Sequence, residues 1–127
     1  GLYLLLLLPG CRGAPEQGDP GLQLELGISP TPPAVGPARL LISLADASGA
    51  PLEGASIQVE GTMSHAGMAP VLDTAVAEGP GRYAVPSFRF TMAGDWVLIV
   101  RASLPDGRWR ELRRDTRVAG GPAGGTP

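Results

Sequence analysis

The stretch "GDWVLIVRASLPDGRWRELRRDTRV" (94–118) decides the fold class of this chain. Its first part, 94–104, is a continuous apolar segment with the length of a buried central strand. Asp106 and Gly107 follow, and Asp-Gly between two strand-like runs is a strong hairpin signal. The second part, 108–118, is the predicted partner strand. A long hairpin of this kind indicates an antiparallel β domain.

Upstream of the hairpin, short segments alternate apolar and polar residues with the period of two that is typical of strands. The predicted strands are 22–28, 38–46 and 56–63. Between the first two lies 29–37, whose four prolines exclude a regular central strand there. The period of 70–78 is ambiguous, and this segment fits either a strand or a single helical turn.

The segment 78–92 opens with a Gly-Pro-Gly turn and is predicted to continue as a strand. Phe88, Phe90 and Met92 share one face of this strand, so Met92 is expected to extend the core. Pro86 predicts an edge position or a bulge, because proline cannot donate to a sheet ladder.

No segment has a convincing helical period, so the predicted fold class is all-β. About seven short antiparallel strands favour an immunoglobulin-like β-sandwich. The predicted organisation is a lipoprotein signal remnant with its lipidation site (1–11), a tether with a possible first strand (12–37), the sandwich domain (38–118) and a disordered tail (119–127).

The N-terminal apolar run Leu2–Leu8 is followed by Pro9, Gly10 and Cys11. The run is too short to span a bilayer as a helix but matches the core of a secretory signal. "LLPGC" is similar to a bacterial lipoprotein signal, in which the cysteine is lipidated. Cys11 would then attach an extracytoplasmic domain to a membrane surface. The alternative is a buried cysteine after an apolar strand.

Composition excludes several classes of function. The formal net charge is −2, which is too small to predict nucleic acid as a partner. All 10 basic residues are arginine, so lysine chemistry is excluded. The single histidine, His65, has no serine placed to form a triad with it, and no glycine-rich phosphate loop precedes a helix. The sequence therefore predicts a binding protein, not an enzyme.

The segment "GTMSHAGMAP" (61–70) carries Met63, His65 and Met68 within six positions. Thioether sulfur favours Cu(I), and imidazole binds copper in both common oxidation states. These three side chains are predicted copper ligands, with Met92 a fourth if its strand lies alongside. The alternative is that the methionines fill gaps in the core, which methionine commonly does.

Five of the ten arginines lie in the last predicted strand, 108–118, together with Trp109. They form either a surface for an anionic partner or one face of an edge strand. Charges on an edge strand prevent edge-to-edge association.

The segment 44–101 resembles the YtkA-like domain family, which is related to the FixH-like proteins. The family pattern contains a turn with Asp, Gly and Pro, a Met/His/Gly-rich loop, Gly-x-Tyr, and Met-x-Gly-x-Trp before the last long strand. The matching positions are Asp46, Gly49, Pro51, Gly54, Ala55, Met63, His65, Gly67, Met68, Pro70, Gly81, Tyr83, Met92, Gly94 and Trp96. Many members have a proline after the first methionine of the loop, whereas here Ser64 follows Met63.

The resemblance implies a membrane-associated, immunoglobulin-like bacterial domain that acts near copper-handling proteins or respiratory oxidases. The leading hypothesis is an extracytoplasmic, lipid-anchored domain that binds or delivers copper, with a copper-dependent oxidase or another membrane protein as partner. The rival hypothesis is a metal-free interaction module that docks on a membrane-protein or envelope partner.

Overall fold

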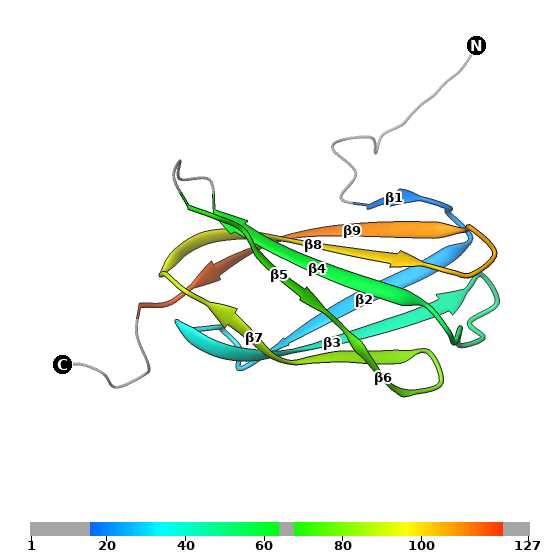
Figure 1. The fold of residues 1–127 in the computed structure, drawn as a ribbon, viewed down its shortest axis with the longest axis horizontal. Coiled ribbons are helices and arrows are strands. Elements are labelled where there is room, and N and C mark those ends of the chain that lie inside the picture. Colours follow the sequence, from blue (N-terminus) through cyan, green and yellow to red (C-terminus); the bar gives the residue numbers. More distant parts are fainter. Residues whose placement is uncertain (1–15, 64–67, 121–127) are drawn as a thin grey trace, which may run out of the picture.

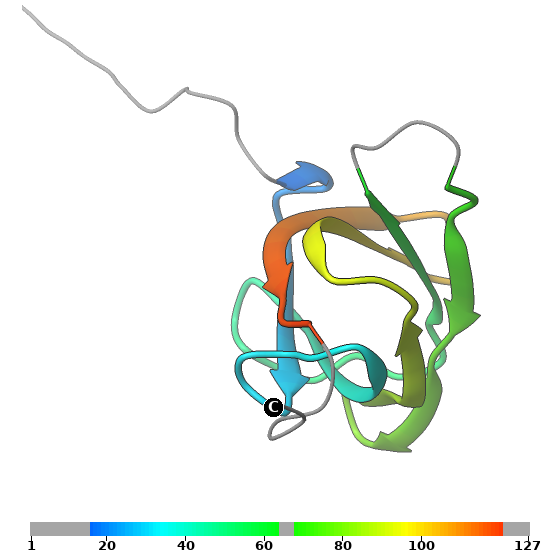
Figure 2. The ribbon, with the colours of Figure 1, turned by 90° about the vertical axis from the view of Figure 1, so that its left-hand side faces the viewer.

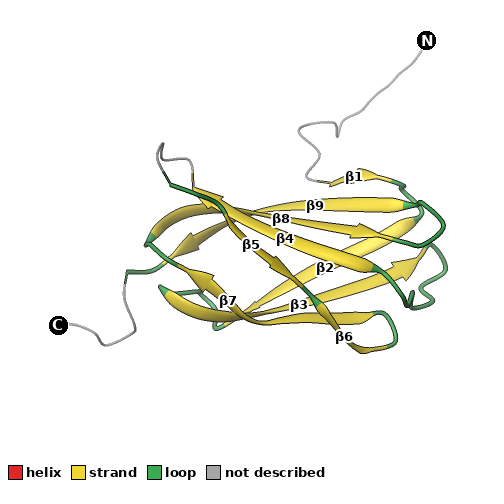
Figure 3. Cartoon of the chain, viewed as in Figure 1, coloured by secondary structure: helices red, strands yellow, loops and turns green. Residues whose placement is uncertain are grey.

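The structure is a computed structural model that describes residues 16–63 and 68–120. Over these residues the chain forms strands joined by loops and turns, with no helix (Figure 3). The described chain therefore offers no helix long and apolar enough to cross a membrane. The strands are β1 (Glu16–Gly18), β2 (Leu22–Ser29), β3 (Gly36–Asp46), β4 (Ser56–Met63), β5 (Val71–Thr74), β6 (Val76–Gly79), β7 (Arg82–Phe90), β8 (Gly94–Ser103) and β9 (Trp109–Val118).

The strands form two antiparallel sheets that stack as a sandwich (Figure 1). The five-stranded sheet has the order β1-β9-β8-β4-β5, and the four-stranded sheet has the order β2-β3-β7-β6. The all-β prediction is confirmed. The expected number of about seven strands is wrong, because the described residues form nine. The immunoglobulin type of topology stays a prediction.

The hairpin that decided the fold class is present. β8 is the middle strand of its sheet, and Ser103 pairs with Trp109 at the closed end of the hairpin. The Leu104 N–H donates to the Arg108 carbonyl at 2.8 Å, and Gly107 has a φ of 97°. An aspartate and a glycine suit this turn because glycine adopts positive φ without steric cost.

The core lies between the two sheets and is built from alternate residues of each strand. In β3, Leu40, Ile42 and Leu44 are buried. Three aromatic rings join the sheets. The ring centroids of Phe88 and Phe90 lie 5.3 Å apart, and those of Phe90 and Trp96 lie 5.1 Å apart, in both cases edge to face. Such geometry is favoured by the charge distribution of aromatic rings.

β2 belongs to the sandwich and not to a tether. Its residues pair with β3 along the whole strand, from Leu22 opposite Asp46 to Ser29 opposite Arg39. Leu22, Leu24 and Leu26 are buried in the core. The sandwich therefore begins well before residue 38, where the sequence had placed its start.

The ambiguous segment 70–78 forms two strands, not a helical turn. β5 pairs with β4 in one sheet, and β6 pairs with β7 in the other. The chain passes between the sheets at Ala75, whose N–H donates to the Ile57 carbonyl at 2.9 Å.

The bulge predicted at Pro86 is confirmed. The register between β3 and β7 shifts between Ala38, opposite Phe88, and Leu40, opposite Val85. The extra residue on β7 falls at the proline, which lacks the N–H that a regular ladder needs.

The end of the chain is partly ordered into the fold. The Ala119 N–H donates to the Pro33 carbonyl at 2.9 Å, and the Val35 N–H donates to the Ala119 carbonyl at 3.1 Å. Ala119 therefore does not belong to the predicted tail, and residues 121–127 lie outside the described residues.

Candidate functional site

The three methionines of the chain lie in or directly beside two connections at one end of the sandwich. Met63 and Met68 flank the β4–β5 connection, and Met92 lies in the β7–β8 turn. We call Met63, Met68 and Met92 with these two connections the methionine-bearing end. Figure 2 views the molecule from this end.

Met63 is a core residue. It is 6% exposed and belongs to the buried hydrophobic cluster. It pairs with Trp96 across the β4–β8 ladder. Its terminal methyl carbon would lie only 2.6 Å from a Cβ added to Gly94. The thioether of Met63 is therefore occupied by packing.

Met92 has the opposite environment. The sequence placed it on the buried face of Phe88 and Phe90, but its side chain is 50% exposed, so that expectation is wrong. β7 ends at Phe90, and the chain turns before Met92 can continue the alternation. Its backbone carbonyl accepts a hydrogen bond from the Trp96 indole Nε1 at 2.8 Å. The turn is therefore anchored while the thioether stays accessible.

Met68 lies between these extremes. It is partly buried and packs against the core cluster. His65, the predicted imidazole ligand, lies outside the described residues, as does the predicted lipidation site Cys11.

The β7–β8 turn requires glycine at position 94. Gly94 has a φ of 132°, in a region that residues with a side chain rarely adopt. Met63 occupies the space beside it that a Cβ would need. Gly94 therefore lets the two connections of the methionine-bearing end pack together.

The Gly-x-Tyr pattern has a structural role at the other end of the sandwich. The Tyr83 hydroxyl donates to the Leu52 carbonyl at 2.9 Å and accepts from the Ala55 N–H at 3.1 Å. A Cβ on Gly81 would lie 2.6 Å from the Cβ of Pro51. These residues hold the β3–β4 connection against the start of β7.

Two carboxyl groups in exposed turns have pKa values below their ordinary range. Hydrogen bonds from the Ser48 hydroxyl and the Ala50 N–H lower the pKa of Asp46. Hydrogen bonds from the Arg108 backbone and side chain lower the pKa of Asp106. In both turns the bonds favour the charged carboxylate. Their role is to fix turns, and neither residue faces a cleft.

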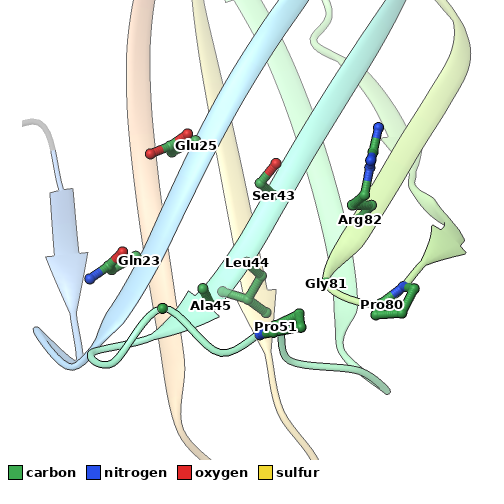
Figure 4. A pocket seen from close by; sticks show the side chains of 10 residues that line it. Gln23, Glu25, Ser43, Leu44, Ala45, Pro51, Pro80, Gly81 and Arg82 are labelled. Atoms are coloured by element: carbon green, nitrogen blue, oxygen red, sulfur yellow. The ribbon is translucent and has the colours of Figure 1, made fainter.

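The groove in Figure 4 lies over the four-stranded sheet and is lined by Gln23, Glu25, Ser43, Arg82 and the turn after β3. It is open to solvent, and its lining combines polar and apolar side chains. Within 16–63 and 68–120, no polar or charged residue is buried, and no three His, Cys, Asp or Glu side chains gather at one point.

Two of the four arginines of β9 are paired with carboxylates. Arg110 contacts Glu16 at 2.7 Å, and Arg117 contacts Asp95 at 2.9 Å. β1 pairs with the start of β9, so β9 is an edge only beyond Leu112. Arg110 and Arg117 therefore secure local contacts, whereas Arg114 donates only to the Leu26 carbonyl, at 3.4 Å.

The fold and the signature turns define a class of two-sheet β-sandwich whose Gly-x-Tyr and Met-x-Gly-x-Trp segments fix the connections at its two ends. The chain belongs to the YtkA-like family, whose model matches residues 16–101. The match begins at β1, so it includes the N-terminal strands that the sequence had assigned to a tether. A comparison with curated proteins gives no match.

Proposed function

We propose that this chain is an extracytoplasmic, lipid-anchored β-sandwich that binds copper at its methionine-bearing end. The observation that carries the proposal is the environment of Met92. Met92 is 50% exposed, on a turn whose backbone carbonyl accepts a hydrogen bond from Trp96. The exposed sulfur has no packing role in the described structure, unlike the sulfur of Met63.

The available donors suit Cu(I). Thioether sulfur is soft and uncharged, and it selects Cu(I) over harder cations. Met68 and Met92 supply two such donors from neighbouring connections, and His65 supplies an imidazole. We assign Met63 a packing role, so the proposed ligand set is Met68, Met92 and His65.

Family membership and the N-terminal sequence support the proposed location. Membership in the YtkA-like family suggests an extracytoplasmic domain. Lipidation of Cys11 would hold this domain on the membrane surface, five residues before β1 begins at Glu16. A Cys11→Ser variant expressed in a bacterial host should move from the detergent phase to the aqueous phase of a Triton X-114 partition. Retention in the detergent phase would contradict the lipid anchor.

Copper binding is tested by titration of the protein with Cu(I) against a competing chromogenic chelator. The proposal predicts one Cu(I) per chain, and a loss of affinity of at least about tenfold in Met68→Leu and in His65→Gln. Leucine replaces methionine with little change in volume, so the comparison isolates the sulfur. A stoichiometry well below one, or unchanged affinity in both variants, would overturn the proposal.

A metal-free interaction module is the second candidate. The burial of Met63 favours it, because that burial removes one of the three ligands clustered in the sequence. In this case the methionine-bearing end is a contact surface for a membrane-protein or envelope partner, such as a copper-dependent oxidase. The copper titration separates the two candidates, since the module predicts no binding.

A further inference from the structure

The outer side of β5 combines an exposed apolar residue with an open sheet edge. β5 is the outermost strand of the five-stranded sheet and lies beside β4 (Figure 1). Its Leu72 is 70% exposed, which is the largest value among the exposed large hydrophobic residues of the described chain. Exposed apolar edges are places where a further strand can pair.

The hydrogen-bond pattern shows where this edge is open. The Ala75 N–H donates to β4, at the Ile57 carbonyl. Because backbone groups alternate along a strand, Leu72 directs its N–H and C=O away from β4. The Thr74 N–H is already bonded to the Asp73 carboxylate at 2.8 Å. The open part of the edge is therefore centred on Leu72.

A shallow groove with a free carboxylate adjoins Leu72. Glu60 on β4 pairs with Leu72 on one side and with Ile99 of β8 on the other. These side chains line the groove together with Gln58, Arg101 and Glu111.

No cation of the described chain lies within ion-pair distance of Glu60. Arg101 is the cation that lines the groove, and it bonds to Glu111 at 2.8 Å. Its guanidinium carbon also lies 4.3 Å from the centroid of the Trp109 ring. Glu60 thus offers a negative charge between two apolar side chains.

We propose that this groove, centred on Leu72 and Glu60, binds an extended segment of a partner protein that carries arginine or lysine. The backbone of the segment would pair with Leu72. A long cationic side chain opposite Leu72 would cover the leucine with its methylene groups and bring its charged head to Glu60. The carboxylate of Glu60 disfavours an anionic membrane surface here. This surface is separate from the methionine-bearing end, and its use does not depend on copper.

Two blocked pentapeptides provide the probe: one alternates threonine with arginine, and the other alternates threonine with glutamate. Each is titrated into the ¹⁵N-labelled protein, and amide chemical shifts are followed by NMR. The arginine peptide should shift the amides of Leu72, Glu60 and Ile99, and the glutamate peptide should leave them unchanged. Equal responses to both peptides, or shifts confined to other surfaces, would overturn the proposal.

Three variants complete the test. Glu60→Gln should weaken binding of the arginine peptide by about two- to fivefold, as expected for one exposed ion pair. Leu72→Ser should weaken it by about threefold or more. Leu41→Ser is the matched control, because Leu41 is an exposed leucine on the outer face of the other sheet. Unchanged binding in Glu60→Gln and Leu72→Ser, or equal loss in Leu41→Ser, would refute the assignment.

Two other occupants of the groove would appear in the same spectra. Shifts at Leu72 that depend on protein concentration alone would assign the surface to a second copy of this chain. Shifts caused by vesicles of anionic phospholipid, without peptide, would assign it to the membrane. Either result would overturn the proposal of a cationic protein segment.

Discussion

Replacing Met63 by alanine should destabilise the protein strongly, because the side chain fills core volume at the methionine-bearing end. Met63 is 6% exposed, and its terminal methyl packs on Gly94. Truncating a buried methionine to alanine costs about 2–5 kcal/mol, depending on how far the site collapses. Met63 lies at the last position of β4, where neighbouring turns can relax, so we expect about 2–3 kcal/mol.

Equilibrium unfolding in urea, followed by tryptophan fluorescence, measures this loss. Trp96 is buried and pairs with Met63 across the ladder, so its emission reports on the same region. A loss of this size lowers the melting temperature by roughly 10–20 °C in a domain of about 100 residues.

Two controls separate packing from other effects. Met63→Leu keeps the volume and should cost less than about 1.5 kcal/mol. Met92→Ala removes a half-exposed side chain and should change stability by no more than about 0.5 kcal/mol. A cost below about 1 kcal/mol for Met63→Ala, or an equal cost for Met92→Ala, would refute the assignment of Met63 to the core.

Three further predictions follow from the turns and connections. Tyr83→Phe should cost about 1–3 kcal/mol in urea unfolding, because it leaves the Leu52 carbonyl and the Ala55 N–H without their partner; an unchanged midpoint would contradict this role. Gly81→Ala should destabilise the protein, since its φ is positive and a Cβ there meets the Leu44 carbonyl at 2.7 Å; an unchanged midpoint would contradict this close packing. The pKa values of Asp46 and Asp106 are lowered in the folded state. The stabilisation that these carboxylates provide is therefore present above the unfolded pKa of about 3.9 and is lost as the pH falls through the lowered values. A variant with both aspartates replaced by asparagine should lose less stability in acid, and an unchanged acid profile would count against this coupling.

The strands with strict alternation could be predicted from the sequence. β3 and β4 place buried apolar residues at alternate positions, and their burial follows that alternation. β8 was predictable instead from its continuous apolar segment. The Asp-Gly turn and the bulge at Pro86 were also predictable, because each depends on the backbone properties of one or two residues.

The crossing of β5 and β6 between sheets could not be predicted. The residues of 71–79 alternate too weakly to distinguish a strand from a helical turn, and the choice is made by pairing with β4 and β7, which are distant in sequence. β1 was missed for a similar reason. It has only three residues, and its pairing with β9 involves contacts nearly a hundred residues apart.

The candidate site was predicted in part. The sequence named Met63, His65 and Met68 as ligands, and Met92 as a possible fourth that was also expected to extend the core. The structure buries Met63 and exposes Met92, because β7 ends before Met92 while β4 continues to Met63. The residue at which a strand ends determines where the alternation of buried and exposed side chains stops. That residue depends on the tertiary structure.

The central claim is that copper binds at the exposed sulfur of Met92 and not at the buried sulfur of Met63. The most direct measurement compares the Cu(I) affinities of Met92→Leu and Met63→Leu with that of the unmodified protein, by competition with one chelator. Our account predicts at least about a tenfold loss for Met92→Leu and an unchanged affinity for Met63→Leu. An unchanged affinity for Met92→Leu, or a comparable loss for Met63→Leu, would contradict it.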